Sequence, residues 1–431
     1  MSSAPSFRSP KLASIFLIVF IDLLGFSLIL PLLPYYAETY GAGPAVIGLL
    51  VATYAAAQFV GAPVLGRLSD RVGRRPVLLA SVAGTLVGFL ILGLAPVLGE
   101  AIAGRFGLAS AAGPILALLF LSRLLDGLTG GNISVAQAYI ADITDERNRA
   151  RGLGLVGAAF GLGFIIGPAA GGTLAAFGYA VPALAASALA GLNLVLVFLF
   201  LPESLDERKR NDLAARPRPS FSFSALRQAL RRPRLGPLLQ VRLLFGLGFA
   251  VFQTVFVLYA QDRLGLGVRT TGFLLAYVGV LAVAVQAGAI PWLSRRVGEP
   301  RLITVNLGVM AAAMLGWALT PNLAALVVVI TPLAVSGGIL NTVINSAISK
   351  AVSPEEIGGS LGLSAALESL ARIVAPIVGA WSLQEVGSWA PGAACALLLA
   401  WTTTFAVRKI SGRTGGAPEA LEPRALAERP A

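Results

Sequence analysis

The sequence lacks histidine altogether and has a single cysteine among 431 residues. The lone Cys395 excludes a disulfide framework and any cysteine-based metal site. Without histidine the chain also lacks the commonest metal ligand and the usual group for proton transfer near neutral pH. We therefore expect no metal ion and no cofactor, and any proton chemistry must fall to carboxylates.

Charged residues are scarce as well, at 13% of the chain, while 56% of the residues are apolar. A soluble domain has about 25% charged residues and roughly 45–50% apolar ones, so this composition is not that of a soluble protein. Apolar stretches of about 20 residues are long enough to cross a hydrocarbon core of roughly 30 Å as helices. The fold class we predict is an all-α polytopic membrane protein with twelve transmembrane helices, near residues 12–33, 46–66, 77–98, 114–141, 152–175, 179–201, 236–260, 270–293, 302–320, 323–349, 358–381 and 388–407.

The basic residues indicate how the chain is oriented. An even number of spans places both termini on one side of the membrane. Of the 33 Lys and Arg residues, three lie on the opposite side (Arg105, Arg263 and Arg269), three lie within or at the end of a span, and the other 27 lie on the side of the termini. Since loops rich in Lys and Arg stay in the cytoplasm, we predict cytoplasmic termini in an inner (plasma) membrane. The formal charge of +12 then reflects topology and anionic lipid headgroups, and we expect no nucleic-acid partner.

The spans fall into two parallel six-helix repeats. The long polar stretch 202–235 predicts a cytoplasmic linker between an N-terminal half at 1–201 and a C-terminal half at 236–407, followed by a cytoplasmic tail at 408–431. RGLGLVGAAFGLGFIIGPAAGG in the first half aligns without gaps with GSLGLSAALESLARIVAPIVGA in the second. Parallel repeats of this kind indicate a transporter whose substrate site lies near the midplane between the halves.

Several motifs resemble one known family of transporters. GRLSDRVGRRPVLL at Gly66–Leu79 resembles the signature of the major facilitator superfamily. SRLLDGLTGGN at 122–132 and GLGFIIGPAAGG at 161–172 resemble the buried-arginine and Gly-Pro motifs of its twelve-helix drug:proton antiporter branch. FIDLLGFSLILPLLP at 20–34 and YIADITDERNRARG at 139–152 resemble the tetracycline-resistance exporters. The resemblance covers nearly the whole chain and implies the major facilitator fold and proton-driven export of a drug.

The chain also departs from the tetracycline-resistance exporters. Those proteins carry a histidine in the eighth helix one turn before a glutamine, whereas here Gln286 is present and Ala282 occupies the histidine position. The predicted third and ninth spans lack acidic residues, where those exporters use aspartates. These departures leave the particular drug open, while the exporter class follows from the resemblance.

Asp22 is the first candidate for a proton-coupling group. It lies ten residues into the first span, about 15 Å deep at roughly 1.5 Å per residue, and therefore near the midplane. A carboxylate at that depth is costly and must face a cavity or a partner. Burial favours the neutral acid, so Asp22 could bind and release a proton in each cycle. The alternative is a hydrogen bond between helices with no role in transport.

Two more carboxylates lie at mid-depth, each within one helical turn of an arginine. Arg123 and Asp126 are three residues apart, so Arg123 either pairs with Asp126 or balances Asp22 or a substrate anion. Glu368 and Arg372 are four apart and predict a structural salt bridge that a charge swap should restore, with a second proton site at Glu368 as the alternative. Because these arginines hold their partners ionised, we favour Asp22 as the proton-coupling residue.

The loop Gly66–Pro76 has an acid, Asp70, embedded among basic residues. The resemblance implies a conformational latch, with Asp70 near a helix of the other half and Arg74 paired with Asp142. Charge that only sets the topology is the alternative, but it does not explain the acid. The latch residues are Gly66, Asp70, Arg71, Gly73, Arg74, Arg75 and Asp142, and we expect Gly66 and Gly73 to permit a tight turn.

Glycines and one proline mark the fifth span. Small residues at four-residue spacing let helix backbones approach closely, and Pro168 should kink the helix. The resemblance implies that this packed kink blocks a leak pathway, and close packing alone is the other interpretation. The residues of this antiporter motif are Gly163, Gly167, Pro168 and Gly171.

An aromatic stripe and several amides are candidates for a substrate cavity. Phe245, Phe249, Phe252 and Phe256 are spaced four, three and four residues apart on the seventh helix. The stripe either packs against its neighbours or offers a stacking surface to a flat apolar or cationic molecule. Amides could orient such a ligand, although each alone is more often a contact between helices. The predicted cavity residues are Gln58, Phe249, Phe252, Gln253, Phe256, Gln286, Asn341 and Asn345.

Together these features predict a monomeric secondary active transporter that exports a small amphipathic compound in exchange for protons by alternating access. Its expected partners are the small-molecule substrate, protons and the lipid bilayer. A proton-coupled symporter or a uniporter for a metabolite is the first alternative, because the fold does not fix the direction of transport. A sensor that transports nothing is the second. We do not predict an enzyme, because the sequence shows no His, Cys or Ser constellation.

Overall fold

The computed structural model describes residues 10–206, 223–353 and 356–410. Long apolar runs form helices because a helix satisfies its own backbone groups where no water is present. The described residues form helices and connections, with no strand among them. Eleven helices are long and apolar enough to cross a membrane, and Val268–Ala284 forms a shorter apolar helix. The chain is therefore a multi-pass helical membrane protein, as its composition predicted.

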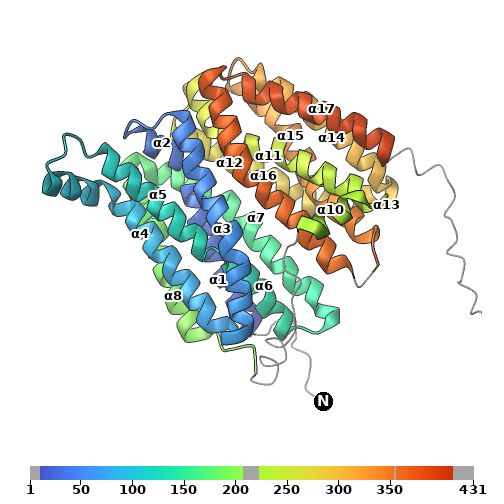
Figure 1. Ribbon diagram of the computed structural model, residues 1–431, viewed down its shortest axis with the longest axis horizontal. Coiled ribbons are helices and arrows are strands. Elements are labelled where there is room, and N and C mark those ends of the chain that lie inside the picture. Colours follow the sequence, from blue (N-terminus) through green and yellow to red (C-terminus); the bar gives the residue numbers. More distant parts are fainter. Residues whose placement is uncertain (1–9, 207–222, 354–355, 411–431) are drawn as a thin grey trace, which may run out of the picture.

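The N-terminal half has six crossings in the described residues (Figure 1). The third crossing extends beyond its predicted span, to Phe106, and so contains the exposed Glu100 near its end. The predicted absence of acids there is correct only for 77–98. The helices are α1 (Pro10–Ile29), α2 (Leu33–Glu38), α3 (Pro44–Val72), α4 (Arg74–Phe106), α5 (Ala112–Thr129), α6 (Asn132–Ile143), α7 (Glu146–Leu174), the 3-10 turn η1 (Ala175–Phe177) and α8 (Ala180–Phe200), with α5 and α6 sharing the fourth crossing.

The C-terminal half repeats this plan with a divided eighth crossing. That crossing consists of α12, a π-helical turn η2 and α13 in succession. Glu299 begins the next helix, so the predicted absence of acids in the ninth crossing is correct only for 302–320. The elements are α10 (Phe223–Arg231), α11 (Leu235–Leu264), α12 (Val268–Ala284), η2 (Val285–Ala289), α13 (Ile290–Arg296), α14 (Glu299–Ala318), α15 (Leu323–Lys350), α16 (Ile357–Glu385) and α17 (Ala390–Lys409).

The predicted linker contains the short helix α10. Its side chains Leu226, Ala229 and Leu230 pack on the core of the C-terminal half. Arg232, just after α10, forms a two-pronged ion pair with Glu356 before α16, with N to O distances of 2.8 and 2.9 Å. The described end of the linker is therefore attached to the C-terminal half.

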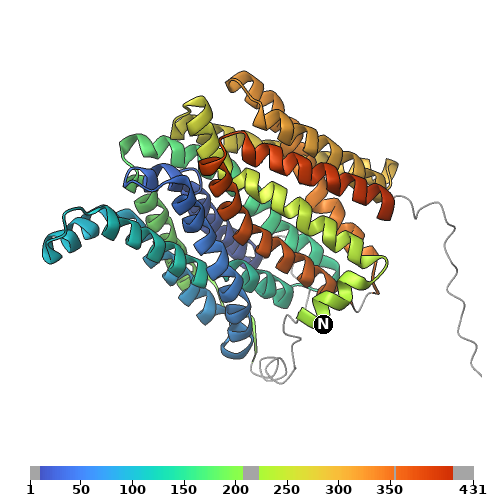
Figure 2. The ribbon, with the colours of Figure 1, turned by 45° about the horizontal axis from the view of Figure 1, so that its top comes forward.

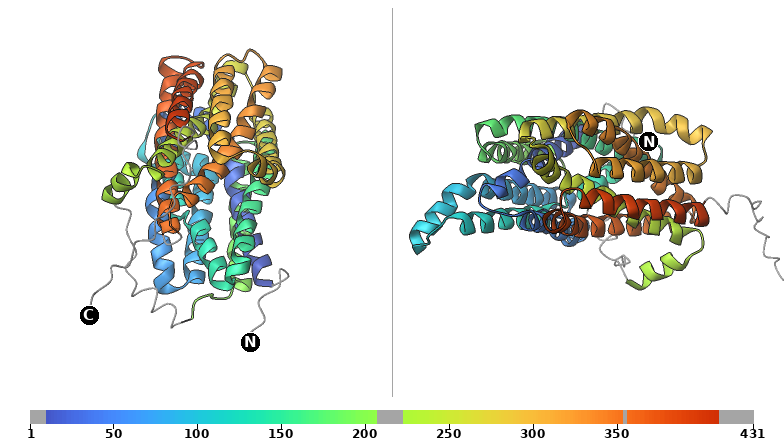
Figure 3. Two further views of the ribbon diagram at one scale, coloured as in Figure 1. Left: turned by 90° about the vertical axis from the view of Figure 1, so that its right-hand side faces the viewer. Right: turned by 90° about the horizontal axis from the view of Figure 1, so that it is seen from above.

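The two halves lie side by side, blue to green and yellow to red in Figures 1 and 2 and in both views of Figure 3. They meet along two helix pairs, α3 with α16 and α7 with α12. Glycine permits both contacts, because a Cβ on Gly48 would lie 2.4 Å from the carbonyl oxygen of Pro376. A Cβ on Gly272 would lie 2.3 Å from the carbonyl oxygen of Pro168.

Hydrogen bonds between the halves gather at the end of the bundle where α2 lies, which we call the α2 end. The Tyr35 hydroxyl donates to the carbonyl oxygen of Leu266 over 2.8 Å and lies 2.9 Å from the Thr271 hydroxyl. The N–H of Ala45 donates to the Gln384 side chain over 3.1 Å. These bonds join the start of the N-terminal half to α12 and α16 and close the α2 end.

At the opposite end of the bundle there is open space beside the face of α7 that contacts α12 and beside the face of α16 that contacts α3. Gly154 and Gly157 continue the face of α7 on which Gly161 approaches Val283 of α12, yet a Cβ at either would meet no described atom within 4 Å. The same is true of Gly362 on α16. Contacts between the halves therefore run from the α2 end to about the middle of the bundle.

Candidate functional site

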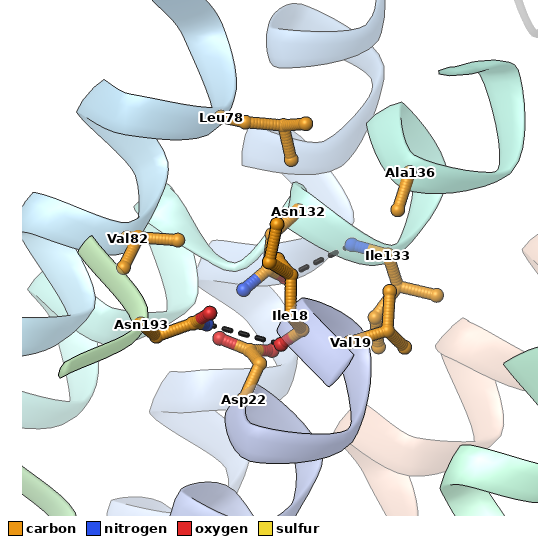
Figure 4. Close-up of a pocket in the computed structure, with 9 residues that line it drawn as sticks. All are labelled: Ile18, Val19, Asp22, Leu78, Val82, Asn132, Ile133, Ala136 and Asn193. Atoms are coloured by element: carbon orange, nitrogen blue, oxygen red, sulfur yellow. Dashed lines mark hydrogen bonds between the residues drawn. The ribbon is translucent and has the colours of Figure 1, made fainter. Parts of the chain in front are cut away.

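Asp22 lines a small pocket inside the N-terminal half (Figure 4). Its carboxyl group accepts a hydrogen bond from the Asn132 side chain. The N–H of Ile133 donates to Asn132 Oδ1 over 2.9 Å, which leaves the NH₂ of that amide to face Asp22. On the other side, Asn193 Nδ2 donates to the carbonyl oxygen of Ile18 over 3.1 Å. Apolar side chains complete the lining: Val19, Leu78, Val82 and Ala136.

An interruption in the fourth crossing places Asn132. Gly130 and Gly131 separate α5 from α6. A Cβ on Gly131 would lie 2.9 Å from Leu65 Cβ, so the close approach of α3 favours glycine there. Gln58 Nε2 donates to the carbonyl oxygen of Gly130 over 3.1 Å and satisfies an acceptor that the interruption frees. Gln58, predicted for the substrate cavity, thus also supports the interruption beside Asp22.

Arg123 and Asp126 form a buried ion pair on α5. Their N to O distance is 3.2 Å, and both side chains are less than 5% exposed. Thr85 hydrogen-bonds Asp126, and the guanidinium group lies 5.5 Å from the ring centre of Phe89. This geometry favours the interpretation in which Arg123 balances Asp126. Among the described residues, no Lys or Arg forms an ion pair with Asp22.

Tyr54 of α3 lies between the charged groups of the two halves. Its hydroxyl accepts a hydrogen bond from Gln58 over 3.0 Å, and its ring centre lies 5.1 Å from that of Phe26. It is close enough to Asp22 and to Arg372 of α16 to interact with both electrostatically. The sequence analysis missed Tyr54, although a tyrosine one turn before a mid-span glutamine was a usable signal.

The C-terminal half has its own cluster of charged side chains. Arg372 Nη2 donates to Glu368 Oε1 over 2.6 Å, so the predicted ion pair is present. Arg242 of α11, which is only 2% exposed, forms a second ion pair with Glu368 and donates to Asn341 Oδ1 over 2.6 Å. Sequence spacing did not connect Arg242 to this cluster, because the residue lies on another helix. The predicted Glu368–Arg372 ion pair is thus present, and Arg242 joins it as a third member that the sequence analysis did not include.

The aromatic stripe of α11 lies in the core of the C-terminal half. Phe252 and Phe256 are 1% and 0% exposed, and the Phe252 ring meets the Trp317 ring edge-on at 5.3 Å. Phe249 packs against Gly337 of α15. The burial of the stripe favours packing over contact with a substrate, and its place in a cavity stays a prediction.

The predicted amides do not form one cluster in this conformation. Asn345 hydrogen-bonds Ser364 over 3.0 Å, and Asn341 hydrogen-bonds Arg242, both within the C-terminal half. Gln253 and Gln286 are exposed, and Gln286 lies in the π-helical turn η2. Their joint contact with a substrate remains a prediction.

The latch residues form a network within the N-terminal half. Arg74 donates to Asp70 over 2.7 Å and to Asp142 over 2.9 Å, so the pairing implied for Arg74 and Asp142 is present. The N–H groups of Arg74 and Arg75 donate to the Glu203 carboxylate over 2.9 and 3.0 Å. A carboxylate at this position also suits the positive N-terminus of α4. Glu203 was missed because it lies at the start of the predicted linker, as its second residue.

The turn is shorter than predicted. α3 continues to Val72, so Gly66 and Arg71 lie in a helix and Gly73 alone makes the turn, with φ +117°. A Cβ on Gly73 would also lie 2.5 Å from Glu203 Oε2. The prediction that Gly66 helps to form a turn was wrong, because one glycine with positive φ suffices and no residue breaks α3 before it.

The glycines of α7 bring that helix against α1. The Ser27 hydroxyl donates to the carbonyl oxygen of Gly163 over 2.8 Å. A Cβ on Gly167 would lie 1.9 Å from Ser27 Oγ, and one on Gly171 would lie 2.1 Å from the carbonyl oxygen of Leu28. With Pro168 facing α12, α7 packs tightly between the two halves.

Within the described residues, twelve helical crossings form two halves, with ion pairs on both sides of the contact between them. This arrangement defines a membrane transporter built from two repeats. The family model of the Major Facilitator Superfamily matches residues 15–376, and the chain belongs to that family. Members of this family are transporters and not enzymes.

Curated relatives include several resistance proteins. The chain is 35% identical to the tetracycline resistance protein of class C from Escherichia coli, over 84% of this chain and 86% of that protein. It is 33% identical to the class G protein from Vibrio anguillarum, over 85% and 91%. Multidrug resistance protein 2 of Bacillus subtilis is 30% identical over 67% and 68%.

Solved structures support the fold. The human organic anion transporter MFSD10 superposes with a TM-score of 0.65 at 23% identity, covering 93% of this chain and all of that one. The nucleoside transporter NupG superposes with a TM-score of 0.72 at 12% identity, covering 93% and 99%. At these identities the likeness concerns the fold alone.

Proposed function

We propose that this transporter exports a small amphipathic drug-like compound in exchange for protons, by alternating access, as a monomer in the inner (plasma) membrane. Both termini then lie in the cytoplasm. Relatives of at least 30% identity that are named for tetracycline or multidrug resistance support the export of drugs. These relatives make tetracyclines the first compounds to test. Other amphipathic drugs are tested next, because Ala282 replaces the histidine that the resemblance implies.

The observation that carries the proposal is the setting of Asp22. This acid lines a largely apolar pocket and takes a hydrogen bond from Asn132, with no cation paired to it among the described residues. Asp126 and Glu368, by contrast, each form an ion pair with an arginine. A mid-membrane acid that neutralises no fixed cation is free to exchange a proton during the cycle.

The proposed coupling acts through the contact between the halves. With cytoplasmic termini, the closed α2 end faces outward and the open end faces the cytoplasm, so this conformation receives substrate from inside. Tyr54 lies within electrostatic reach of Asp22, Asp126 and Arg372. Binding of a proton at Asp22 therefore changes the charge felt across the contact, which favours reorientation of the halves.

The latch is proposed to set the preference between orientations. The side chains of Arg74 and Asp70 are 4% and 5% exposed. Arg74 on α4 binds Asp70 on α3 and Asp142 on α6, and so joins these three helices. The network fixes the inner ends of these helices as one unit. Asp70 would then bias the equilibrium between the two orientations of the halves.

Proteoliposomes that enclose a pH-sensitive dye test the proposal. Purified protein is exposed to external tetracycline or to a panel of amphipathic drugs, with no imposed gradient. Antiport predicts that entry of the drug makes the interior more alkaline, because protons leave in exchange. Acidification would indicate symport, and a drug uptake without any pH change would indicate a uniporter.

A further inference from the structure

We propose that the substrate carries a carboxylate or an equivalent anionic group, and that this group binds Arg372, beside the buried Arg242, on the C-terminal side of the contact between the halves. The inference deepens the proposed export function and rests on it. The juxtaposition that carries it is the cluster formed by Arg242, Asn341, Glu368 and Arg372 from α11, α15 and α16.

The cluster contains more positive than negative charge. Both Arg242 and Arg372 form ion pairs with the single carboxylate of Glu368. Asn341 accepts a hydrogen bond from Arg242 but brings no charge. One positive charge is thus left without an acid inside the cluster. On the opposite wall Arg123 balances Asp126, and among the described residues Asp22 forms no ion pair with an arginine of the cluster.

The two arginines are held in different ways. Arg242 is 2% exposed and fixed by Asn341 and Glu368, and its Nε is buried with no hydrogen-bond partner among the described residues. The side chain of Arg372 is 53% exposed and uses Nη2 to reach Glu368. A guanidinium group has five N–H donors, so Arg372 keeps donors for a ligand.

The exposed part of Arg372 faces the protein interior and not the lipid. Two positions along a helix correspond to about 200°, so residues 370 and 374 point away from Arg372. Those positions belong to an exposed apolar stripe on α16 that suits lipid: Leu370, Val374, Ile377, Val378 and Trp381. Pro376, one turn after Arg372, contacts Gly48 of α3. Arg372 itself lies within electrostatic reach of Tyr54, which is also on α3.

We assign the rest of the ligand to an aromatic cluster around Tyr54 in the N-terminal half. The Phe26 ring lies 5.1 Å from the Tyr54 ring and 6.3 Å from the Phe164 ring. These three aromatic residues come from α1, α3 and α7 of the N-terminal half. A planar guanidinium group binds a carboxylate in a two-pronged arrangement, and aromatic rings accept a flat apolar body. The site thus fits an aromatic or apolar acid.

Binding to the detergent-solubilised full chain tests this inference without transport. The probes are pyrenebutyrate, its methyl ester and the pyrenebutyl trimethylammonium cation, which share one fluorescent body and differ in charge. We expect the carboxylate to bind at least about tenfold more tightly than the cation. Arg372→Gln should weaken carboxylate binding about tenfold, because it removes a charged hydrogen bond, and leave ester binding unchanged.

Two further variants control for folding and for charge in general. Arg372→Lys keeps the charge and should retain most of the carboxylate affinity. Arg408→Gln removes an exposed arginine at the end of α17 and should change nothing. Equal binding of carboxylate and cation, or equal loss of carboxylate and ester binding in Arg372→Gln, would overturn the inference. Proton exchange by a cationic drug would still support the proposed function, so the two can fail separately.

Discussion

A methyl group added at Gly171 should separate α1 from α7. The Cβ of Gly171→Ala would lie 2.1 Å from the carbonyl oxygen of Leu28, which is backbone and cannot rotate away. Ordinary contact begins near 3.4 Å, so the helices must move apart locally by the difference, about 1.3 Å. The same movement stretches the 2.8 Å hydrogen bond between Ser27 and Gly163 two turns away.

The expected loss of stability in Gly171→Ala follows from the steric overlap and the weakened hydrogen bond. Overpacking of a dense contact costs about 1–3 kcal/mol, and a weakened hydrogen bond between membrane helices adds roughly 0.6 kcal/mol. We expect a destabilisation of about 2–3 kcal/mol in Gly171→Ala. With an unfolding entropy of roughly 2.1 cal/mol/K per residue over 431 residues, each kcal/mol lowers the midpoint by about 1 °C, so a thermal unfolding scan of the purified protein should show a shift of about 2–3 °C.

Gly157→Ala is the matched control on the same helix. A Cβ there would meet no described atom within 4 Å, so the helix propensity of alanine should leave stability unchanged or slightly raised. Vesicles that contain Gly171→Ala should also leak protons faster in the absence of substrate than vesicles with Gly157→Ala. Equal midpoints for the two variants would refute the steric argument for the α1 and α7 contact.

Three other perturbations follow from the contacts. Asp70→Asn removes the 2.7 Å ion pair with Arg74. This variant should nearly abolish transport in vesicles while membrane insertion and drug binding persist, and normal transport would contradict the role of the latch. The double variant Glu368→Arg with Arg372→Glu should be several kcal/mol less stable than wild type, because the swap sets a second cation beside the buried Arg242. A thermal midpoint near that of wild type would show that Arg242 does not contribute to the cluster. Tyr35→Phe removes the hydroxyl that joins Leu266 and Thr271, so the α2 end should open in about tenfold more molecules. Spin labels at Thr39 and Asp262 would show this as a larger population at long distance, and an unchanged distribution would contradict the closing role of Tyr35.

The sequence was sufficient for features that depend on one helix at a time. Apolar length predicted the crossings, and spacings of three and four residues predicted the Arg123–Asp126 and Glu368–Arg372 pairs. The pairing of Arg74 with Asp142 came from the resemblance to a family, since 68 residues separate them. The ends of the helices were predicted less accurately than the crossings, because α3 and α4 continue as helix past the predicted spans 46–66 and 77–98.

Contacts between helices were not accessible in the same way. Arg242 reaches Glu368 across 126 positions, and no local pattern marks that approach. The interruption at Gly130 and Gly131 depends on how closely α3 passes, which a single sequence does not reveal. The aromatic stripe had two interpretations, and the neighbour that favours packing, Trp317, lies on α14.

The central claim is that Asp22 carries the coupling proton, and one comparison tests it most directly. Proteoliposomes with wild type, Asp22→Asn or the exposed-acid control Glu100→Gln are assayed for drug accumulation driven by a pH gradient and for downhill drug exchange without one. Because asparagine mimics the permanently protonated acid, Asp22→Asn should lose accumulation and keep downhill exchange at a reduced rate, while Glu100→Gln should keep both. An Asp22→Asn protein that still concentrates the drug at close to the normal rate would contradict the claim and move the proton site elsewhere, with Glu368 as the next candidate.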